Sequence, residues 1–308
     1  MKYRPLGKTG LSVSEIGLGA TQIGWPSVTE AEAERVLQGA LDAGINFIDT
    51  AARYRLSESR IGRFIAKQKA RFIVATKCGG WIEYVDGQEK ASWDYSPAGI
   101  LRTIDRSRQQ MKLDVIDIVQ FHGLPNNRPL DPKDPRSGYD VKAAFDALFE
   151  AKARGWVRFV GVSSDGAASA DVVRQWPLDV QECNYNLLLQ EAETDLFPLC
   201  QESQRGVIAK RPIANRVYLL KERPEGNEEG LQYDRAQTFP LRDLAGGGDL
   251  IDFTLRFTLA HPAVSTAIIG TASAEHLAAN ARVSDGRLLP ADTLARAKQS
   301  FRQLFGRA

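Results

Sequence analysis

Four residues that are widely spaced along the chain carry side chains that together could protonate a carbonyl oxygen: Asp49, Tyr54, Lys77 and His122. Tyr54 alone is a weak acid, because an unperturbed phenol has a pKa of about 10. A neighbouring ammonium such as Lys77 would bring that pKa towards working pH, and Asp49 would hold the ammonium charged and oriented. His122, as a neutral donor, would polarise and position the carbonyl oxygen.

The sequence predicts that these residues stand at the ends of β-strands. Asp49, Lys77 and His122 each end a short apolar run, and Tyr54 follows Asp49 by five residues. Mostly continuous apolar runs are typical of strands that are buried on both faces of a parallel sheet. We expect strands at residues 15–18, 45–49, 72–77, 115–122, 159–163, 178–181, 207–210 and 266–270.

Helical patterns fill most of the intervals between these runs. The first begins at Thr29 with Glu32 three residues later, which is the pattern of a capping box. It stops at Gly44, and glycine commonly ends a helix. We expect helices at residues 29–43, 57–65, 97–111, 141–153, 195–204, 251–260 and 273–281.

The alternation of strands and helices predicts an α/β fold, and about eight strands are the number that closes a (β/α)8 TIM barrel. Residues 3–13 are expected to form an N-terminal β-hairpin that closes one end of the barrel. A doubly wound open sheet is the alternative, but residues 17–22 carry Gln22 where its phosphate-binding turn would have the last glycine. We therefore expect residues 1–308 to form one barrel domain, in which the carboxyl ends of the strands converge on one face.

Several segments in the same order resemble the aldo-keto reductase family. They are residues 44–54 (GINFIDTAARY), 75–77 (ATK) and 119–122 (VQFH). The resemblance extends from about residue 3 to residue 282 and maps the family's catalytic Asp, Tyr, Lys and His onto the four residues named above. It implies a (β/α)8 barrel that binds an extended NADP(H) and reduces an aldehyde or ketone reversibly to an alcohol.

The resemblance also implies a set of residues that contact the nicotinamide end of the cofactor. Ser163 and Ser164 match the segment that contacts the carboxamide, although the family often has Asn at the second position. Gln181 matches the glutamine that fixes the carboxamide. Lys210 stands where many members have an aromatic residue, so its methylenes could cover the ring while Arg211 meets a phosphate.

The expected adenosine end lies near the start of the last predicted helix. Gly270 and Thr271 precede that helix, and His276 and Asn280 lie on it. Backbone N–H groups at a helix N-terminus suit an anion, here the 2′-phosphate of NADP. The family often has Arg or Lys in place of His276, but the resemblance still favours NADP(H) over NAD(H).

The composition is that of an ordinary globular protein and argues against several other classes of function. Lys plus Arg is 40 and Asp plus Glu is 38, which gives a net charge of +2 and no reason to expect nucleic acid or a membrane as partner. The three cysteines and the lack of a signal peptide or long apolar run favour the cytoplasm. No cluster has the spacing of a metal site. The expected partners are a small carbonyl or alcohol substrate and, at most, further copies in a small homo-oligomer.

Two alternatives stay open at the level of the sequence. One is a cofactor-binding regulatory or sensor subunit with little turnover, a role found in potassium-channel β subunits, which resemble this family. The other is a Schiff-base aldolase that uses Lys77 as its nucleophile. Residues 79–95 and 215–248 are expected to be long loops, and specificity for the substrate would depend on such loops.

Overall fold

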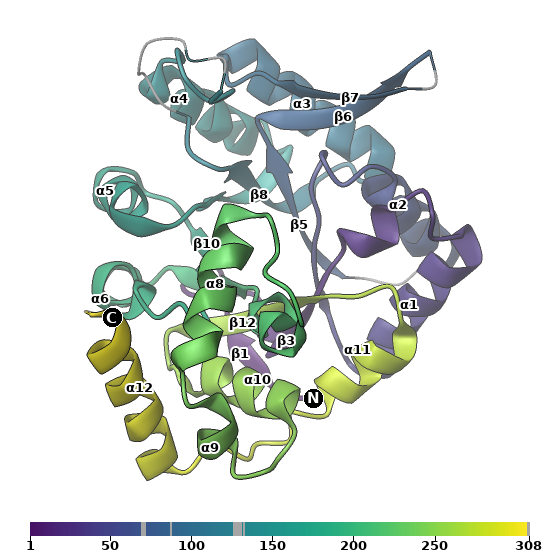
Figure 1. Ribbon diagram of the computed structural model, residues 1–308. Coiled ribbons are helices and arrows are strands. Elements are labelled where there is room, and N and C mark those ends of the chain that lie inside the picture. The colour runs from purple at the N-terminus through teal and green to yellow at the C-terminus, as the bar shows by residue number, and fades with distance from the viewer. Residues whose placement is uncertain (69–71, 87, 126–130, 132, 307–308) are drawn as a thin grey trace.

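Eight parallel strands close into a barrel in the computed structural model (Figure 1), which describes residues 1–68, 72–86, 88–125, 131 and 133–306. Each barrel strand pairs with the barrel strand that follows it in the sequence, and the last of them pairs with the first. The strands are β3 (Ile16–Gly19), β4 (Phe47–Asp49), β5 (Ile73–Cys78), β8 (Ile116–His122), β9 (Val157–Ser163), β10 (Val180–Asn184), β11 (Gly206–Lys210) and β12 (Val264–Gly270). The predicted TIM barrel is therefore confirmed.

Helices surround the barrel (Figure 1) and connect most of its consecutive strands. The first helix begins as predicted, because Glu32 N–H donates to Thr29 Oγ1 and the Glu32 carboxylate accepts from the Thr29 N–H. Gly44 follows this helix with a φ of 77°. The helices between barrel strands include α1 (Glu30–Asp42), α2 (Ser57–Gln68), α3 (Pro97–Met111), α4 (Val141–Ala153), α5 (Gly166–Gln175), α6 (Ala192–Asp195), α7 (Phe197–Glu202) and α10 (Leu250–Ala260).

Two helices follow the last strand of the barrel. They are α11 (Ala274–Ala281) and α12 (Ala291–Phe305). The first of them was predicted, whereas α5 and α12 had no counterpart among the predicted helices. The predicted helix at 195–204 is divided into α6 and α7, between which Leu196 lies.

Both segments that were predicted to be long loops contain regular structure. Within residues 79–95, β6 (Gly80–Val85) pairs in antiparallel orientation with β7 (Gln88–Trp93). Residues 215–248 contain most of the 3-10 helix η2 (Ala214–Leu219), followed by α8 (Asn227–Thr238) and α9 (Leu241–Ala245). In Figure 1, α8 lies in front of the barrel strands. Its sequence is polar and contains Gly230, so it carries little of the apolar periodicity by which a helix is predicted.

The N-terminal hairpin closes the barrel at the end where the strands begin. β1 (Tyr3–Pro5) pairs with β2 (Ser12–Ser14), as predicted. Leu6 and Val13 are fully buried against the innermost strand residues, which are Phe47, Ala75, Ile118, Val180, Ile208 and Ile268. Gly7 has a φ of 53° and lies so close to the start of β11 that an added Cβ would be 2.3 Å from the Gly206 nitrogen. The hairpin is thus part of the barrel core.

No helix within the described residues is both long and apolar enough to cross a membrane.

We expect Leu6→Ala to destabilise the protein by about 2–5 kcal/mol, because it removes buried methyl groups and leaves a cavity below the barrel core. The midpoint of urea unfolding, followed by circular dichroism, measures this loss. Leu220→Ala is the matched control, since Leu220 is 47% exposed, and its effect should stay within about 0.5 kcal/mol. Equal midpoints for both variants would contradict the assignment of the hairpin to the core.

Candidate active site

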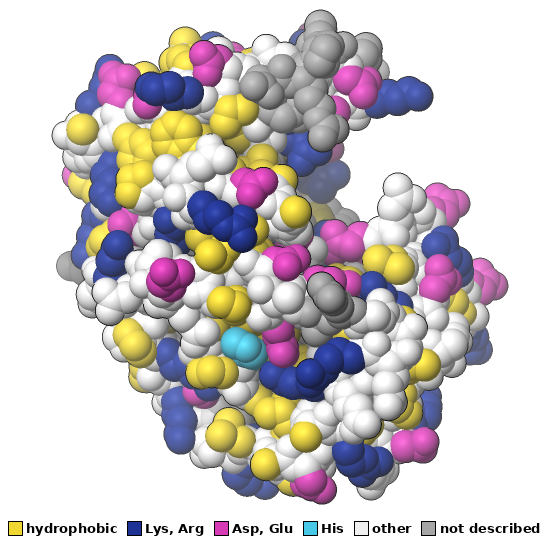
Figure 2. Space-filling model, turned by 90° about the vertical axis from the view of Figure 1, so that its left-hand side faces the viewer, with side chains coloured by type: hydrophobic (Ala, Val, Ile, Leu, Met, Phe, Trp, Pro, Cys, Tyr) yellow, Lys and Arg dark blue, Asp and Glu magenta, His cyan; other side chains and the backbone are white. Residues whose placement is uncertain are grey.

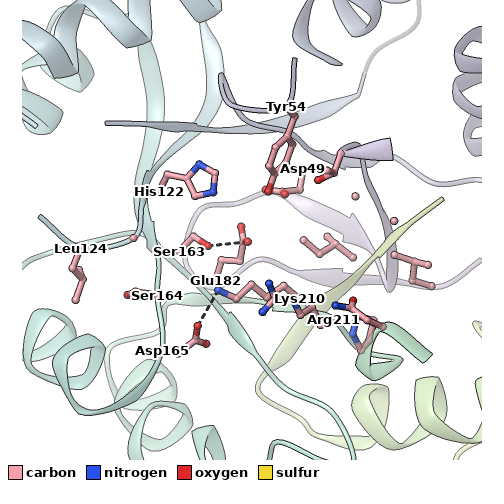
Figure 3. A pocket seen from close by; sticks show the side chains of 18 of the residues that line it. Asp49, Tyr54, His122, Leu124, Ser163, Ser164, Asp165, Glu182, Lys210 and Arg211 are labelled. Atoms are coloured by element: carbon pink, nitrogen blue, oxygen red, sulfur yellow. Dashed lines mark hydrogen bonds and ion pairs between the residues drawn. The ribbon is translucent and has the colours of Figure 1, made fainter. Parts of the chain in front are cut away.

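A cavity of about 1130 Å³ opens at the carboxyl ends of the barrel strands. The side of the molecule that faces the viewer in Figure 1 is on the right in Figure 2. The surface is hollowed there, and Lys, Arg, Asp and Glu side chains lie around the hollow. Asp49, Tyr54 and His122 line this cavity together with residues from β9, β10 and β11 (Figure 3). Catalytic residues of this barrel fold lie at the same end of the strands.

The structure brings the four predicted catalytic residues together. Lys77 Nζ donates to both carboxylate oxygens of Asp49 at 2.5 Å. The same ammonium lies 5.3 Å from the centre of the Tyr54 ring, and the rings of Tyr54 and His122 meet edge to face with their centres 5.8 Å apart. One compact group therefore combines a phenol, an ammonium, a carboxylate and an imidazole.

Glu182 is a fifth member of this group, and the sequence analysis did not single it out. Its Oε2 lies 3.3 Å from Lys77 Nζ and accepts a hydrogen bond from Gln120 Nε2 at 2.8 Å. Its Oε1 accepts from Ser163 Oγ at 2.9 Å (Figure 3). Lys77 is only 1% exposed and the side chains of Asp49 and Glu182 are 2% exposed, so one buried ammonium is shared by two buried carboxylates.

The proximity of these charges changes their affinities for protons. Burial and the neighbouring Glu182 raise the pKa of Asp49 well above its ordinary value. Burial opposes ionisation of Glu182 too, but the ammonium groups of Lys77 and Lys210 outweigh it and lower the pKa of that carboxyl to about 2. Burial likewise opposes the charge on Lys77, yet Asp49 and Glu182 prevail and raise the pKa of this amine. A permanently charged Lys77 is a poor nucleophile, which argues against the Schiff-base alternative.

The phenol of Tyr54 is a weaker acid here than was expected from its neighbour Lys77. Burial raises the pKa of Tyr54 above 10, and the carboxylates of Asp49 and Glu182 act in the same direction. Lys77 acts in the opposite direction, as predicted, but does not outweigh the other effects. Tyr54 is therefore mainly protonated at neutral pH and able to give up a proton to a more basic oxygen.

His122 is held as a neutral imidazole. Burial and the charges of Lys77 and Arg53 lower its pKa to about 3. Tyr95 Oη donates to the His122 carbonyl oxygen at 2.7 Å and so fixes the end of β8. The Nδ1 atom of His122 is buried and has no hydrogen-bond partner among the described residues. A neutral ring with a nitrogen unused by the protein can donate a hydrogen bond to a bound oxygen.

The predicted nicotinamide contacts are brought to the cavity with one exception. Ser163 and Ser164 line the cavity. Gln181, on β10, is not among the described lining residues, whereas its neighbour Glu182 is. Side chains alternate along a strand, and the interior residue Val180 places Glu182 inside the barrel and Gln181 outside. Gln181 Nε2 instead donates to two backbone carbonyl oxygens.

Lys210 and Arg211, which were predicted to contact the cofactor, both line the cavity, and both form ion pairs. Lys210 Nζ lies 2.9 Å from the carboxylate of Asp165 (Figure 3), and Arg211 pairs with Glu228 at the start of α8. Arg211 has a φ of 54°, in the left-handed region that non-glycine residues seldom adopt. These cations can bind a phosphate after exchanging their present partners.

The residues predicted for the adenosine end lie around the start of α11. Gly270 lines the cavity, and Thr271 Oγ1 accepts from the Ser273 N–H at 3.0 Å. His276 is exposed and Asn280 is half-buried, both on α11. Thr271, His276 and Asn280 are thus not among the described residues that line the cavity.

Comparison with known proteins shows the family of this chain. A model of the aldo/keto reductase family matches residues 15–300, and the chain belongs to that family of oxidoreductases. It is 28% identical over 308 residues to YqkF of Bacillus subtilis, an uncharacterized oxidoreductase, with 94% of this chain and 93% of YqkF covered. It is 31% identical over 240 residues to the D-threo-aldose 1-dehydrogenase of a Pseudomonas species, with 70% of each chain covered.

A solved structure agrees with this result over almost the whole chain. The holo form of aldo-keto reductase AKR11C1 from Bacillus halodurans is 28% identical and superposes with a TM-score of 0.80. The match covers 97% of this chain and 96% of that chain. The recognition of the family from the sequence is therefore confirmed.

The cavity fits the nicotinamide cofactor that aldo-keto reductases use. Its volume slightly exceeds the upper range of pockets for drug-sized ligands, which is about 1,000 Å³. Gln22 lines it and has a buried Oε1 without a partner among the described residues. Lys210, Arg211 and Arg216 supply positive charge for phosphates along the same lining. Within the described residues, no group of His, Cys, Asp and Glu could hold a metal ion.

The neutral state of His122 predicts how stability depends on pH. Its pKa is about 3 in the folded protein and about 6.5 in an unfolded chain, so acid protonates the unfolded state first. The free energy of unfolding should therefore fall as the pH drops from about 6.5 towards 3. His122→Asn should make this fall shallower, by at most about 1.4 kcal/mol per pH unit, in urea unfolding measured between pH 7 and pH 4.5.

Two other histidines define the control for this experiment. The pKa of His261 is also lowered by burial, to about 4, so the slope should decrease in the variant without vanishing. His276→Asn changes an exposed side chain on α11 instead and is the substitution with which the slope of His122→Asn is compared. An unaltered slope in His122→Asn would mean that this imidazole is not kept neutral by the fold.

Proposed function

We propose that this protein reduces an aldehyde or ketone to an alcohol, and catalyses the reverse reaction, with NADP(H) as the hydride carrier and Tyr54 as the proton donor. The observation that carries the proposal is the convergence of Tyr54, His122, Lys77 and Asp49 at one cavity at the strand ends. Membership of the aldo/keto reductase family supports it. When bound, the cofactor supplies or accepts the hydride.

The residues of this chain supply the acid and the electrostatic environment. In reduction, the neutral Tyr54 gives its phenolic proton to the carbonyl oxygen, which becomes strongly basic as the carbon receives hydride. Lys77 stabilises the phenolate that remains, and Asp49 orients the ammonium. His122, being neutral, donates a hydrogen bond to the same oxygen without delivering a competing proton. In oxidation the phenolate accepts the proton of the alcohol.

The substrate side of the cavity combines aromatic and basic groups. Trp93, at the end of β7, lines the cavity with its ring centre 6.1 Å from that of His122. The guanidinium of Arg53 lies 4.0 Å from the Trp93 ring centre and holds the indole in place. Leu124 and Arg136 line the same region. This environment suits a small carbonyl compound with an apolar or aromatic body.

Consumption of NADPH with a reactive aromatic aldehyde tests the proposed acid. Tyr54→Phe should lower kcat by about 10²–10⁴-fold while NADPH still binds, because only the phenolic proton is lost. Tyr3→Phe is the matched control, since Tyr3 lies on β1 at the opposite end of the barrel and should leave turnover unchanged. Equal turnover in all three proteins would exclude Tyr54 as the donor. Tight NADPH binding without any turnover in the native protein would favour the sensor role.

The choice of NADP(H) over NAD(H) can be tested at the start of α11. Glu275 is exposed in the first turn of this helix and accepts from Ser273 Oγ at 2.8 Å, so its charge opposes a 2′-phosphate there. Glu275→Gln should raise the affinity for NADPH about threefold and leave that for NADH unchanged, in titrations of protein fluorescence. Glu202→Gln, on α7, is a control that should alter neither. Tighter binding of NADH than of NADPH by the native protein would overturn the choice.

A further inference from the structure

The floor of the cavity, formed by Asp49 and Glu182, presents two carboxyl groups to a ligand but no uncommitted ammonium. Asp49 and Glu182 both line the cavity, while Lys77, the ammonium that they share, is buried and is not among the described lining residues. The next cation, Lys210, is already paired with Asp165 at 2.9 Å. A ligand that enters therefore meets the Glu182 carboxylate, which has a lowered pKa and is ionised, beside an ammonium, Lys77, that is already committed to Asp49 and Glu182.

Apart from Lys77, the groups that bond directly to Glu182 add no positive charge. Ser163 and Gln120 bond to Glu182 through uncharged side chains, and His122 is neutral. Burial strengthens the effect, because a charge in a low-dielectric interior acts on its neighbours more strongly than one in water. The negative charge of Glu182 would be stabilised by a further cation placed in the cavity.

We propose that Glu182 makes this site favour the oxidised, positively charged form of nicotinamide over the neutral reduced form. This inference rests on the proposed function, since it requires the nicotinamide end of the cofactor to bind at the floor near Tyr54, Ser163 and Glu182. The oxidised ring differs from the reduced ring mainly by one positive charge. A fixed carboxylate therefore distinguishes the two forms by charge, where a neutral amide would not.

The consequence is a preference in cofactor loading. In a mixture of both forms the enzyme would be occupied mainly by the oxidised one, which accepts a hydride from an alcohol. In that direction the alcohol carbon loses hydride to the cofactor, and the alcohol oxygen loses its proton to the Tyr54 phenolate. The carboxylate at position 182 thus biases the enzyme towards dehydrogenation, whereas Gln181, on the outer face of the same strand, cannot.

Binding of the two cofactor forms, measured separately by protein fluorescence without substrate, tests this inference. In Glu182→Gln, the ratio Kd(NADPH)/Kd(NADP⁺) should fall about tenfold relative to the native protein. The substitution removes the charge and keeps an oxygen that can accept from Ser163 Oγ. Glu182→Asp keeps the charge and should retain most of the native ratio.

Glu58→Gln is the matched control, because Glu58 is also a buried carboxyl but lies on α2 outside the cavity, where it accepts from Thr76 Oγ1 at 2.6 Å. Its ratio should equal the native one. An unchanged ratio in Glu182→Gln would overturn the inference and leave the proposed function standing, whereas failure of the native protein to bind either form would overturn both. Should Glu182→Gln not fold, native protein that binds NADPH more than about tenfold tighter than NADP⁺ would itself overturn the inference.

Discussion

The site depends on one buried ammonium, Lys77, that is held between the carboxylates of Asp49 and Glu182. Removing charges from water is costly, and attraction between them offsets that cost only where the geometry is good and other hydrogen bonds complete the group. The backbone carbonyl of Thr50 and the side chains of Gln120 and Ser163 provide those bonds. An ammonium so enclosed stays charged, and its position determines where a phenolate can be stabilised.

The barrel makes this enclosure possible because alternate residues of every strand point inwards. Below the site the inward residues are apolar and pack on Leu6 and Val13 of the N-terminal hairpin. One layer higher they are the charged and polar groups of the site, which come from five different strands: Asp49, Lys77, His122, Ser163 and Glu182. The apolar layer excludes water from beneath the charges, and the open upper end admits the ligand. The same strands thus carry both the apolar core and, above it, the functional residues.

Much of this arrangement could be predicted from the sequence, because apolar runs that end in polar residues mark both the strands and their functional ends. The assignment of Gln181 shows the limit of that reasoning. Both Gln181 and Glu182 are polar and buried, and only the pairing register determines which of them faces inwards. The hairpin at 80–93 and helix α8 were missed for a related reason. Strand β7 of the hairpin and helix α8 contain few apolar residues, so their sequences lack a clear period.

The charges of the floor and those of the rim differ in how they are held. The floor groups stand on barrel strands and have several partners each, so they cannot rearrange when a ligand enters. Lys210 and Arg211, at the end of β11 and just beyond it, pair with Asp165 and Glu228, which a phosphate can displace. Affinity for phosphate groups is therefore reduced by the cost of breaking these ion pairs. Discrimination between the oxidised and the reduced nicotinamide at the floor requires no ion pair to be broken. A fixed floor charge distinguishes ligands by their own charge, because the side chains that carry it are held by several hydrogen bonds.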